Sequence, residues 1–491
     1  MKSIQIKIMS TVALFSLCLA CSDDFLDKTD TYEINSEAYF NSEDDYNKAL
    51  IGAYELLHST YKNVLLGEIA SDNTLCGGES ANDVIGFQQV DAMIHTPVNA
   101  QLKDIWDWMF AGVNRAAYIL EFKDKTAFAD RDMIIGEARF LYAYYNFELV
   151  KWFGAIPIKP DKRFAQGDEA KLPRSATSEV YALIEQNLLF AIEHLPTTPP
   201  KGEVGRATKG AAQALLGKVY LYQNKFDKAA EVLEAVISSG TYSLVADYNS
   251  IFEKEGENGA ESVFEVQYTD ADGASFDCLQ CSKGNVAVGF NGIRNYNGPL
   301  FDSGYSFNVP TKEAAAAFEE GDKRKDVAIL DIVAWAAAQG ATYSEGYNHT
   351  GYFNRKYLPR KGDLNMGDAN LTNPNNYRAI RYADVLLMAA EALNRGGISD
   401  TRAQQYLNEV RKRAFGDDNH KVTATGAALT EAIWNERRVE FLGEGLRFFD
   451  LVRTGQGTKI QGFTVGKNEV FPIPYEEIKY ANGNWQQNPN Y

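Results

Sequence analysis

The segment Asn435–Gly455, NERRVEFLGEGLRFFDLVRTG, concentrates residue types that could do acid–base chemistry. Glu436 and Glu440 are four positions apart, so on a helix they share one face. Such carboxylate pairs cleave glycosidic bonds when a cleft and its surroundings set their pKa values apart. Here the acids and arginines alternate with Phe, Leu and Val, which predicts that most charges pair with each other inside the fold. We therefore interpret the segment as a structural clamp between two helices joined at Gly443–Gly445.

The rest of the chain offers little other catalytic chemistry. It contains no phosphate-binding GxxxxGK[ST] loop, GxSxG nucleophile motif, HExxH zinc motif or GxGxxG dinucleotide fingerprint. Asp and Glu number 66 against 49 Lys and Arg, so acid pairs occur throughout and no single pair indicates a glycoside hydrolase. The sequence thus predicts a protein that is not an enzyme.

The overall charge narrows the class of partner. The formal net charge is −17 and the isoelectric point is about 4.9. Negative charge of this size opposes binding to nucleic acid or to an anionic membrane surface, whereas a neutral ligand is compatible with it. No cofactor is expected. No metal site is expected either, because the chain has only five His and no loop of the EF-hand type.

Sugar binding has its own requirements, and two loop-rich regions meet them. A sugar ring presents an apolar face, which suits flat aromatic side chains, and a fringe of hydroxyl groups, which suits Asp, Asn, Glu or Arg. The candidates for contact with a glycan are Phe290, Arg294, Tyr296, Trp335, Tyr343 and Tyr347 in the later region, and Asp72, Asn73, Glu79, Asn82 and Asp83 in the earlier one. For two of these candidates a structural role is the alternative to ligand contact. Trp335 could end a strand against the core, and Asp72–Asn73 could only build a turn.

The elements that would position these residues are mainly helices. Residues 42–57 predict a helix that begins at Ser42 with acids in its first turn, a favourable N-cap arrangement. Residues 102–122 have apolar side chains at three- and four-residue steps, and 131–153 form a longer aromatic-rich helix that stops at Gly154. Trp106, Trp108, Trp152 and Trp434 fall inside such patterns and are expected in the core.

A repeat of helix pairs is visible at Ala207–Gly240, where two helical segments flank the short turn QNKF. Its length is about the 34-residue period of the tetratricopeptide repeat, and its small residues allow close helix packing. A weaker copy spans Tyr377–Phe415, and residues 178–195 predict another helix of the same kind. Because such repeats bury their faces only against each other, we expect them to stack.

Between the two repeats, residues 241–376 are rich in Gly, Asn, Asp, Ser and Tyr and contain a strand-like run at Ser262–Tyr268. A loop-rich insertion of this size in a helical array is more often functional than structural. Residues 67–98 have a similar composition. We therefore predict a helical scaffold at about 40–240 and 377–455, a ligand subdomain at about 241–376, and a C-terminal segment at 456–491.

The five cysteines are Cys18, Cys21, Cys76, Cys278 and Cys281. CLQC at residues 278–281 has the spacing of a redox motif, but no βαβ pattern surrounds it, and a zinc site would need a second ligand pair. A local disulfide and buried free thiols remain as the two interpretations.

The N-terminus has the features of a signal peptide. MKSIQIKIMSTVALFSLCLAC has two lysines, a run of about a dozen apolar residues that is too short to span a bilayer, and then small residues before Cys21. We predict that residues 1–20 are a lipoprotein signal peptide and that Cys21 becomes the lipidated first residue. The alternative is an ordinary secretory signal that is cut elsewhere.

Several segments together resemble one family. They are CSDDFLD at 21–27, GEARFLYAYYNFELVKWFGAIPI at 136–158, the repeat from Ala207, YRAIRYADVLLMAAEAL at 377–393, the opening segment and the terminal VFPIPYEEI…NPNY. The chain resembles the SusD/RagB family of outer-membrane nutrient-binding lipoproteins along nearly its whole mature length. The acidic residues after Cys21 resemble the surface-export signal of Bacteroidetes lipoproteins.

The resemblance implies a mostly α-helical, tetratricopeptide-like superhelix of about four helix pairs with a loop-rich insertion that carries short strands. It implies capture of glycan at the cell surface without catalysis, and delivery to a partner, a SusC-like TonB-dependent outer-membrane transporter. Capture of peptide, as in the RagB branch, is the first alternative. Glycoside hydrolysis is the second.

Overall fold

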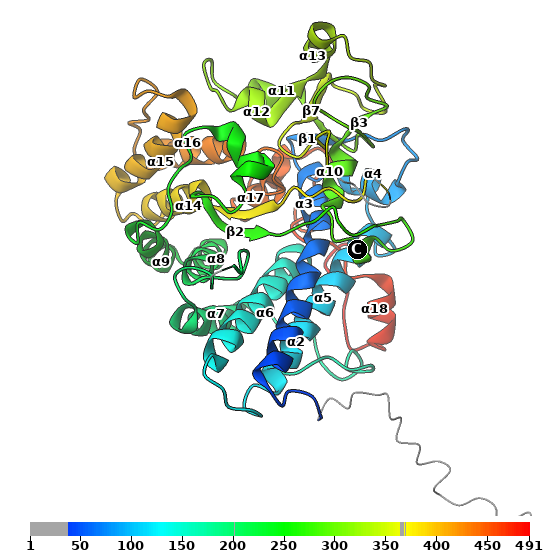
Figure 1. Ribbon diagram of the computed structural model, residues 1–491, viewed down its shortest axis with the longest axis vertical. Helices are drawn as coiled ribbons and strands as arrows, with labels where there is room; N and C mark the ends of the chain where they lie inside the picture. The colour runs from blue at the N-terminus through cyan, green and yellow to red at the C-terminus, as the bar shows by residue number, and fades with distance from the viewer. Residues whose placement is uncertain (1–37, 201, 364–367, 369) are drawn as a thin grey trace, which may run out of the picture.

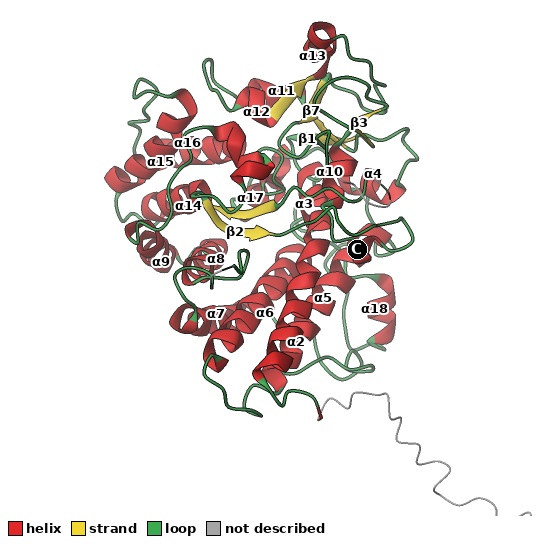
Figure 2. Cartoon of the chain, in the orientation of Figure 1, coloured by secondary structure: helices red, strands yellow, loops and turns green. Residues whose placement is uncertain are grey.

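The computed structural model describes residues 38–200, 202–363, 368 and 370–491. The predicted signal peptide and the predicted lipidation site Cys21 lie outside the described residues. The described chain is mostly helical with a few short strands (Figures 1 and 2), which confirms the predicted fold class. Among the described helices, none combines the length and the apolar character that crossing a bilayer requires.

The scaffold is built from helix pairs that pack one against the next. In Figure 1 these helices run from the lower part of the molecule to its left side, β2 lies near the centre, and β1, β3 and β7 lie in the upper right. The first two pairs are α2 (Glu43–Glu55) with α5 (Ala100–Glu121) and α6 (Arg131–Phe153) with α7 (Thr177–His194). The next two are α8 (Lys209–Tyr222) with α9 (Phe226–Ser238) and α14 (Tyr382–Arg395) with α15 (Asp400–Phe415).

Local signals set the ends of these helices as the sequence predicted. The Ser42 hydroxyl accepts a hydrogen bond from the backbone N–H of Asp45, and the Asp45 carboxylate accepts one from the N–H of Ser42. This capping box satisfies donors that the first turn of α2 would otherwise leave free. α6 ends where Gly154 takes a φ of +71°, a conformation that favours glycine.

Close packing inside the repeat depends on its small residues. A Cβ atom at Gly217 of α8 would collide with the side chain of Leu233 on α9. α9 also packs against α14, so the two sequence repeats are neighbours in space although about 140 residues of chain separate them. The predicted stacking of the repeats is therefore confirmed.

The start of the second repeat differs from the prediction. The sequence pattern extended a helical repeat back to Tyr377, but Tyr377–Arg381 form strand β8, which pairs antiparallel with β2 (Ser262–Val266). All five residues of β8 are buried, so pairing with β2 satisfies backbone groups that water cannot reach. The strand predicted at Ser262–Tyr268 is confirmed, and its partner is the segment that was misassigned.

The insertion and the earlier loop region are tied together by short strand pairs rather than by one sheet. Each of the sheets in the described chain has two strands. Besides β2–β8 they are β1 (Thr74–Cys76) with β5 (Asn308–Pro310), the parallel pair β3 (Ile293–Arg294) and β4 (Ser303–Gly304), and β6 (Ile329–Asp331) with β7 (Tyr352–Asn354). The β1–β5 pair joins the two regions that the sequence marked as ligand loops.

Short helices complete these regions. The ones before and within the insertion are α3 (Tyr61–Ile69), α4 (Ile85–Asp91), α10 (Val286–Asn291), α11 (Lys312–Ala316), α12 (Lys325–Ala328) and α13 (Ile332–Gln339). After α15 come α16 (Gly426–Glu440), α17 (Arg447–Arg453) and, near the C-terminus, α18 (Tyr475–Tyr480). Residues 67–98, expected to be a long loop, thus contain the end of α3, β1 and α4.

Trp335 lies on α13 and does not end a strand, so that alternative is wrong. The preceding strand β6 stops at Asp331, whose carboxylate accepts a hydrogen bond from the backbone N–H of Ala334 and so starts the helix. One side of the Trp335 ring packs on a small core under the insertion, where its centroid lies 5.4 Å from that of Phe301. The rest of the side chain is partly exposed.

Candidate ligand-binding site

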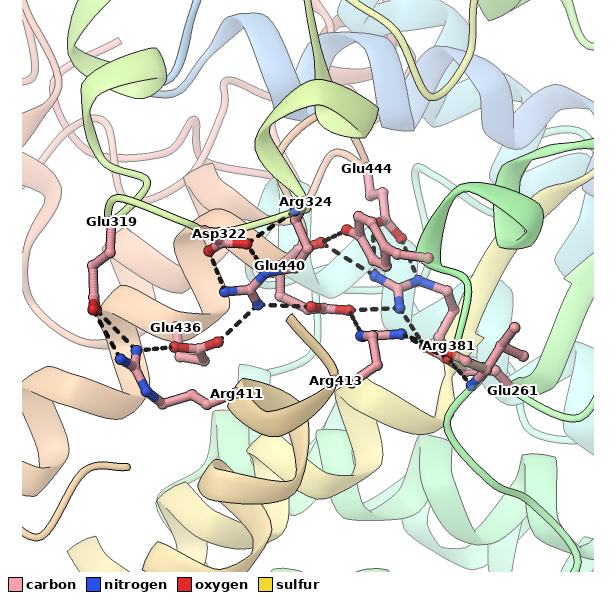
Figure 3. Close-up of polar contacts among 12 residues, drawn as sticks. Glu261, Glu319, Asp322, Arg324, Arg381, Arg411, Arg413, Glu436, Glu440 and Glu444 are labelled. Atoms are coloured by element: carbon pink, nitrogen blue, oxygen red, sulfur yellow. Dashed lines mark hydrogen bonds and ion pairs between the residues drawn. The ribbon is translucent and has the colours of Figure 1, made fainter. Parts of the chain in front are cut away.

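The acid- and arginine-rich segment forms a buried ion network (Figure 3). Glu440 is fully buried at the C-terminal end of α16, where its carboxylate contacts Arg324 at 2.8 Å, Arg381 at 2.9 Å and Arg413 at 2.6 Å. Burial alone would raise the pKa of Glu440, but these three guanidinium groups hold the pKa well below its ordinary value. Glu436, one turn earlier, contacts Arg324 at 2.7 Å, so the two acids share a face as predicted.

A second part of the network joins α14, α16 and α17. Arg437 contacts Asp384 at 2.7 Å and Asp450 at 2.9 Å, while Arg453 contacts Asp450 and Glu391, each at 2.7 Å. Burial opposes the ionised form of Glu391, yet the charge of Arg453 lowers the pKa of that carboxyl to about 2. Each of these carboxylates has a guanidinium partner, so the structure confirms the clamp interpretation. We define the clamp as these two parts of the network. The first part consists of Arg324, Arg381, Arg413, Glu436 and Glu440, and the second of Asp384, Glu391, Arg437, Asp450 and Arg453.

The clamp also holds the first ligand loop. The fully buried carboxylate of Glu68, at the end of α3, accepts hydrogen bonds from the backbone N–H groups of Gly443 and Gly445, at 3.0 and 2.9 Å. It also accepts one from the Thr74 hydroxyl at 3.1 Å. Nothing in the local sequence marked Glu68, because Gly443 and Gly445 lie more than 370 positions away.

Asp72 and Asn73, two predicted ligand contacts, are placed against this anchor. The Asp72 carboxylate makes a two-point contact with Arg447, at 2.7 and 2.9 Å. The buried Asn73 side-chain oxygen accepts a hydrogen bond from Arg438 at 2.7 Å. Burial would raise the pKa of Asp72, but the hydrogen bonds and charge of Arg447 lower it. The Asp72 carboxylate and the Asn73 side-chain oxygen are thus engaged by the scaffold, whereas the buried Asn73 amide nitrogen has no hydrogen-bond partner.

Most of the remaining candidates lie where three segments meet, which we call the loop junction (residues 77–83, 294–306 and 343–350), whereas Phe290 and Trp335 lie outside these segments. The backbone N–H of Tyr347 donates to the carbonyl of Gly78 at 2.9 Å, and the N–H of Ser344 donates to the carbonyl of Arg294 at 2.9 Å. The amide of Asn348 donates to the carbonyl of Cys76 at 3.0 Å. The structure therefore brings together residues that are more than 200 positions apart in the sequence.

Arg294 is the side chain that links the parts of the junction. Its Nη2 lies 3.3 Å from the Asp83 carboxylate and donates to the carbonyl of Tyr305 at 2.9 Å, while its Nε contacts the Ser306 hydroxyl at 3.3 Å. The guanidinium is only half-buried, so part of it faces solvent. An arginine held in this way has a fixed orientation and retains donors for a ligand hydroxyl.

The predicted aromatic contacts divide into two groups. Tyr343, Tyr347 and Trp335 are partly exposed. Tyr296 and Phe290 are buried: the Tyr296 hydroxyl accepts from the Trp335 indole N–H at 2.9 Å and donates to the carbonyl of Pro299 at 2.8 Å, and the Phe290 ring packs in the main core. The first group can offer ring faces to a ligand, whereas the second supports the surface from below.

Exposed polar side chains complete the junction. Glu79 and Asn82 project from a turn that the Asp83 carboxylate closes by accepting a hydrogen bond from the N–H of Glu79 at 2.8 Å. Val84, Asn295, Ser306 and Asn348, in or next to the junction, have positive φ values of +45°, +50°, +57° and +52°. Backbone strain of this kind clusters at functional sites, since the surrounding structure must enforce it.

Sequence reasoning missed Ser344, Asn348 and His349, which hold the third segment in place. The His349 ring lies beneath Tyr343, with 5.6 Å between the ring centroids, and burial lowers the pKa of the imidazole. His349 therefore packs as a neutral ring at neutral pH. The available signal was the clustering of these residues between Tyr343 and Thr350 among turn-forming Gly and Asn.

Three cavities of the described chain lie away from the junction. Cavities of about 30, 180 and 220 Å³ occur in the structure, and all three are lined by residues outside the junction. In the part of the chain that the structure describes, no cluster of three or more His, Cys, Asp or Glu side chains is arranged to hold a metal ion. The partly exposed rings and exposed polar groups of the junction suit contacts with sugar rings and their hydroxyl groups.

Comparison with known proteins identifies the family to which this fold belongs. A model of the SusD family matches residues 267–491, and a SusD-like model described as "Starch-binding associating with outer membrane" matches residues 24–221. A solved laminarin-binding SusD-like protein is 32% identical, with coverage of 92% of this chain and 100% of that chain and a TM-score of 0.84. The chain belongs to the SusD/RagB family.

Other SusD-like proteins have similar folds. Surface glycan-binding protein A from Bacteroides thetaiotaomicron, solved in complex with laminarihexaose, is 27% identical over 91% of this chain and 100% of that chain, with a TM-score of 0.81. "SusD-like protein P25" from Formosa agariphila is 24% identical, with 97% of each chain covered. The family resemblance seen in the sequence is thereby confirmed.

Proposed function

We propose that this protein binds a glycan at the loop junction without catalysing a reaction on it. The observation that carries the proposal is the convergence, at the loop junction, of the segment with the partly exposed rings of Tyr343 and Tyr347 and the turn with the exposed side chains of Glu79 and Asn82. The rings supply faces for the apolar side of sugar rings, and Arg294 and the acids supply partners for hydroxyl groups. The carboxylates of the clamp are paired with arginines, so they offer no free acid–base pair.

The ligand class follows from the relatives. Two solved relatives with TM-scores above 0.8 are a laminarin-binding protein and a glycan-binding protein solved with laminarihexaose. We infer that the ligand of this chain is a laminarin-type glucan, read by stacking at Tyr343 and Tyr347 and by hydrogen bonds from Arg294. Trp335 adds a third partly exposed ring.

The glycan is then passed to a SusC-like TonB-dependent transporter at the outer membrane. Three features support this step: the lipoprotein signal at residues 1–20, the predicted lipidation site Cys21, and the outer-membrane association in the family description. Because the net charge of −17 gives no attraction to an anionic membrane surface, attachment depends on the lipid. The protein is then a surface-exposed lipoprotein whose ligand face serves the transporter.

The test uses the chain from Ser22 onward, without lipid. Native gels that contain laminarin or unrelated plant, host and microbial polysaccharides show binding as retardation, and calorimetry with laminarihexaose gives the affinity. Retardation by laminarin, with no product in a parallel assay for new reducing ends, is the expected result. Retention by peptide mixtures and not by any polysaccharide would overturn the proposal in favour of peptide capture, and release of reducing ends would overturn the non-catalytic assignment.

A further inference from the structure

The loop after β2 carries an aromatic residue that the sequence analysis did not single out. Phe276 is 54% exposed, and it is the one phenylalanine of the described residues whose side chain is exposed. Other large apolar side chains are exposed one at a time on helices or turns, as is common on protein surfaces. Phe276 differs because the loop around it is tied down on several sides.

The structure of the loop keeps the Phe276 ring outside. The loop closes where the N–H of Thr269 donates to the carbonyl of Lys283 at 3.0 Å. Ala274 and Leu279, on either side of Phe276, pack against the main core. The disulfide between Cys278 and Cys281 closes the turn that follows, so the predicted local disulfide is the interpretation that the structure adopts. A short loop fixed at these points leaves Phe276 little freedom to fold back onto the core.

The ring of Phe276 continues the loop junction. Its centroid lies 5.8 Å from that of Tyr305, in an edge-to-face arrangement, and Tyr305 packs in turn on Phe290. The carbonyl of Tyr305 accepts a hydrogen bond from Arg294, which also contacts the Asp83 carboxylate. The Arg294 guanidinium thus links the turn that carries Glu79 to Tyr305, the residue on which the Phe276 ring packs.

We propose that Phe276 forms an outer subsite that stacks on a sugar ring of the same glycan chain, beyond Arg294 as seen from Tyr347. This inference rests on the proposed function. The occupant is a glycan because Tyr305 and Arg294 link the Phe276 ring to the junction by direct contacts. Polar groups also lie near the ring: Asp277 is exposed, and the amide of Asn370 contacts the Tyr305 hydroxyl at 3.3 Å. The Cys278–Cys281 disulfide positions the subsite and is not a redox catalyst.

An outer subsite makes a specific demand on ligand length. A short oligosaccharide can occupy the junction alone, whereas a longer one reaches Phe276 as well. Loss of one stacked ring weakens binding of nucleotide bases to aromatic residues by about tenfold or more, and we expect a similar factor here. The loss should fall on laminarihexaose and laminarin and should be much smaller for laminaribiose.

The experiment measures calorimetric affinities for laminaribiose, laminarihexaose and laminarin with the chain from Ser22 onward. The variants are Phe276→Ala, Phe276→Trp and the Cys278→Ser/Cys281→Ser pair. The control is Leu189→Ala, which removes a similarly exposed apolar side chain (52%) from α7. We expect Phe276→Ala and the cysteine pair to lose about tenfold in affinity for the two longer ligands, Phe276→Trp to retain it, and Leu189→Ala to match the unaltered protein.

The outcomes separate this inference from the proposed function. Undiminished binding of laminarihexaose and laminarin by Phe276→Ala, with binding lost on removal of Tyr343 and Tyr347, would overturn the outer subsite and leave the proposed function standing. An equal loss for all three ligands, or a lowered thermal unfolding midpoint in Phe276→Ala, would overturn the subsite as well. Absence of glycan binding by the unaltered protein would overturn both proposals together.

Discussion

The clamp and the loop junction are built from the same residue types but treat them in opposite ways. In the clamp, Glu440 and Arg381 are fully buried and each polar end meets an oppositely charged partner within 3 Å. In the junction, Glu79 is exposed, and Arg294 makes a longer 3.3 Å contact with Asp83 while part of its guanidinium faces solvent. The same residue types thus stabilise packing in the clamp, whereas in the loop junction they retain hydrogen-bonding capacity for a ligand.

The difference teaches which feature of a charged cluster indicates function. Residue type and spacing do not separate the two regions, because both combine acids, arginines and aromatic rings. The two regions differ in how fully the fold satisfies the polar groups, which we call saturation. A group whose hydrogen-bond and charge partners all lie inside the fold specifies structure, whereas an oriented group with unused donors or acceptors is available to bind a ligand. Four predictions test this distinction, from the largest expected effect to the smallest.

The largest effect is expected from Arg437→Ala in the clamp. The substitution removes one of two cationic partners from each of two acids, because Asp384 then keeps only Lys218 and Asp450 keeps only Arg453. Removal of one partner from a buried pair costs about 3–5 kcal/mol. Denaturant unfolding followed by circular dichroism should show this loss in the free energy of unfolding.

The matched control is Arg402→Ala. Arg402 makes an ion pair with Glu234 at 2.6 Å, but the arginine side chain is 44% exposed. Exposed pairs contribute about 0–1 kcal/mol. Equal losses in the two variants would contradict the assignment of the clamp as a buried network.

Acid should weaken the clamp through Glu391. The pKa of this carboxyl is lowered from 4.5 to about 2 in the folded protein, so ionisation stabilises the native state above pH 4.5. That contribution, roughly 3 kcal/mol, is lost as the pH falls from about 4.5 towards 2. The gap in unfolding free energy between the unaltered protein and Glu391→Gln should therefore shrink over this interval.

The control for the acid experiment is Asp44→Asn, which removes an exposed ion pair with Lys48 on α2. Its gap from the unaltered protein should be small at every pH, because exposed pairs add little stability. A Glu391→Gln gap that stays constant from pH 7 to pH 2 would mean that the carboxylate is not stabilised by Arg453 as the structure indicates.

The sequence revealed the fold better than it revealed the site. Helix ends at Ser42 and Gly154 follow from local capping and backbone preferences, so they could be predicted from neighbouring residues. The strand at Tyr377–Arg381 could not, because its state depends on pairing with β2 more than 100 positions earlier. Local pattern alone does not contain that information.

The same limit explains the mixed outcome for the candidate site. Composition identified the two loop regions, and the structure brings Glu79, Asn82, Arg294, Tyr343 and Tyr347 together. Composition could not tell that distant Arg447 and Arg438 would engage Asp72 and Asn73, or that Phe290 would be buried. Phe276 was overlooked because its proposed role in binding depends on its contact with Tyr305, and the two rings meet only in the folded chain.

The third prediction concerns the exposed rings. Tyr347→Ala should weaken laminarihexaose binding by about 1–3 kcal/mol, by analogy with base stacking, and should leave the thermal unfolding midpoint nearly unchanged. Tyr343→Ala should weaken binding similarly but also lower the midpoint, because the Tyr343 ring packs on the small core under the insertion. Trp335→Ala should lower both quantities, because its indole also donates to Tyr296 and packs on Phe301. Calorimetry and thermal melts on the same samples decide whether the tyrosines belong to a ligand surface or to the core.

The last prediction concerns Arg294→Ala, the counterpart of Arg437→Ala in the junction. Because Arg294 is half-buried and its ion pair with Asp83 is long, its loss should cost at most about 1 kcal/mol of unfolding free energy. Glycan affinity should nevertheless fall several-fold, since the turn at Glu79 and the carbonyl of Tyr305 lose their common donor. Arg294→Lys keeps the charge without the forked geometry, so it should recover stability but little affinity. If Arg294→Ala instead destabilised the fold as strongly as Arg437→Ala and left binding intact, the junction would be a second clamp, and saturation would not separate structure from function in this protein.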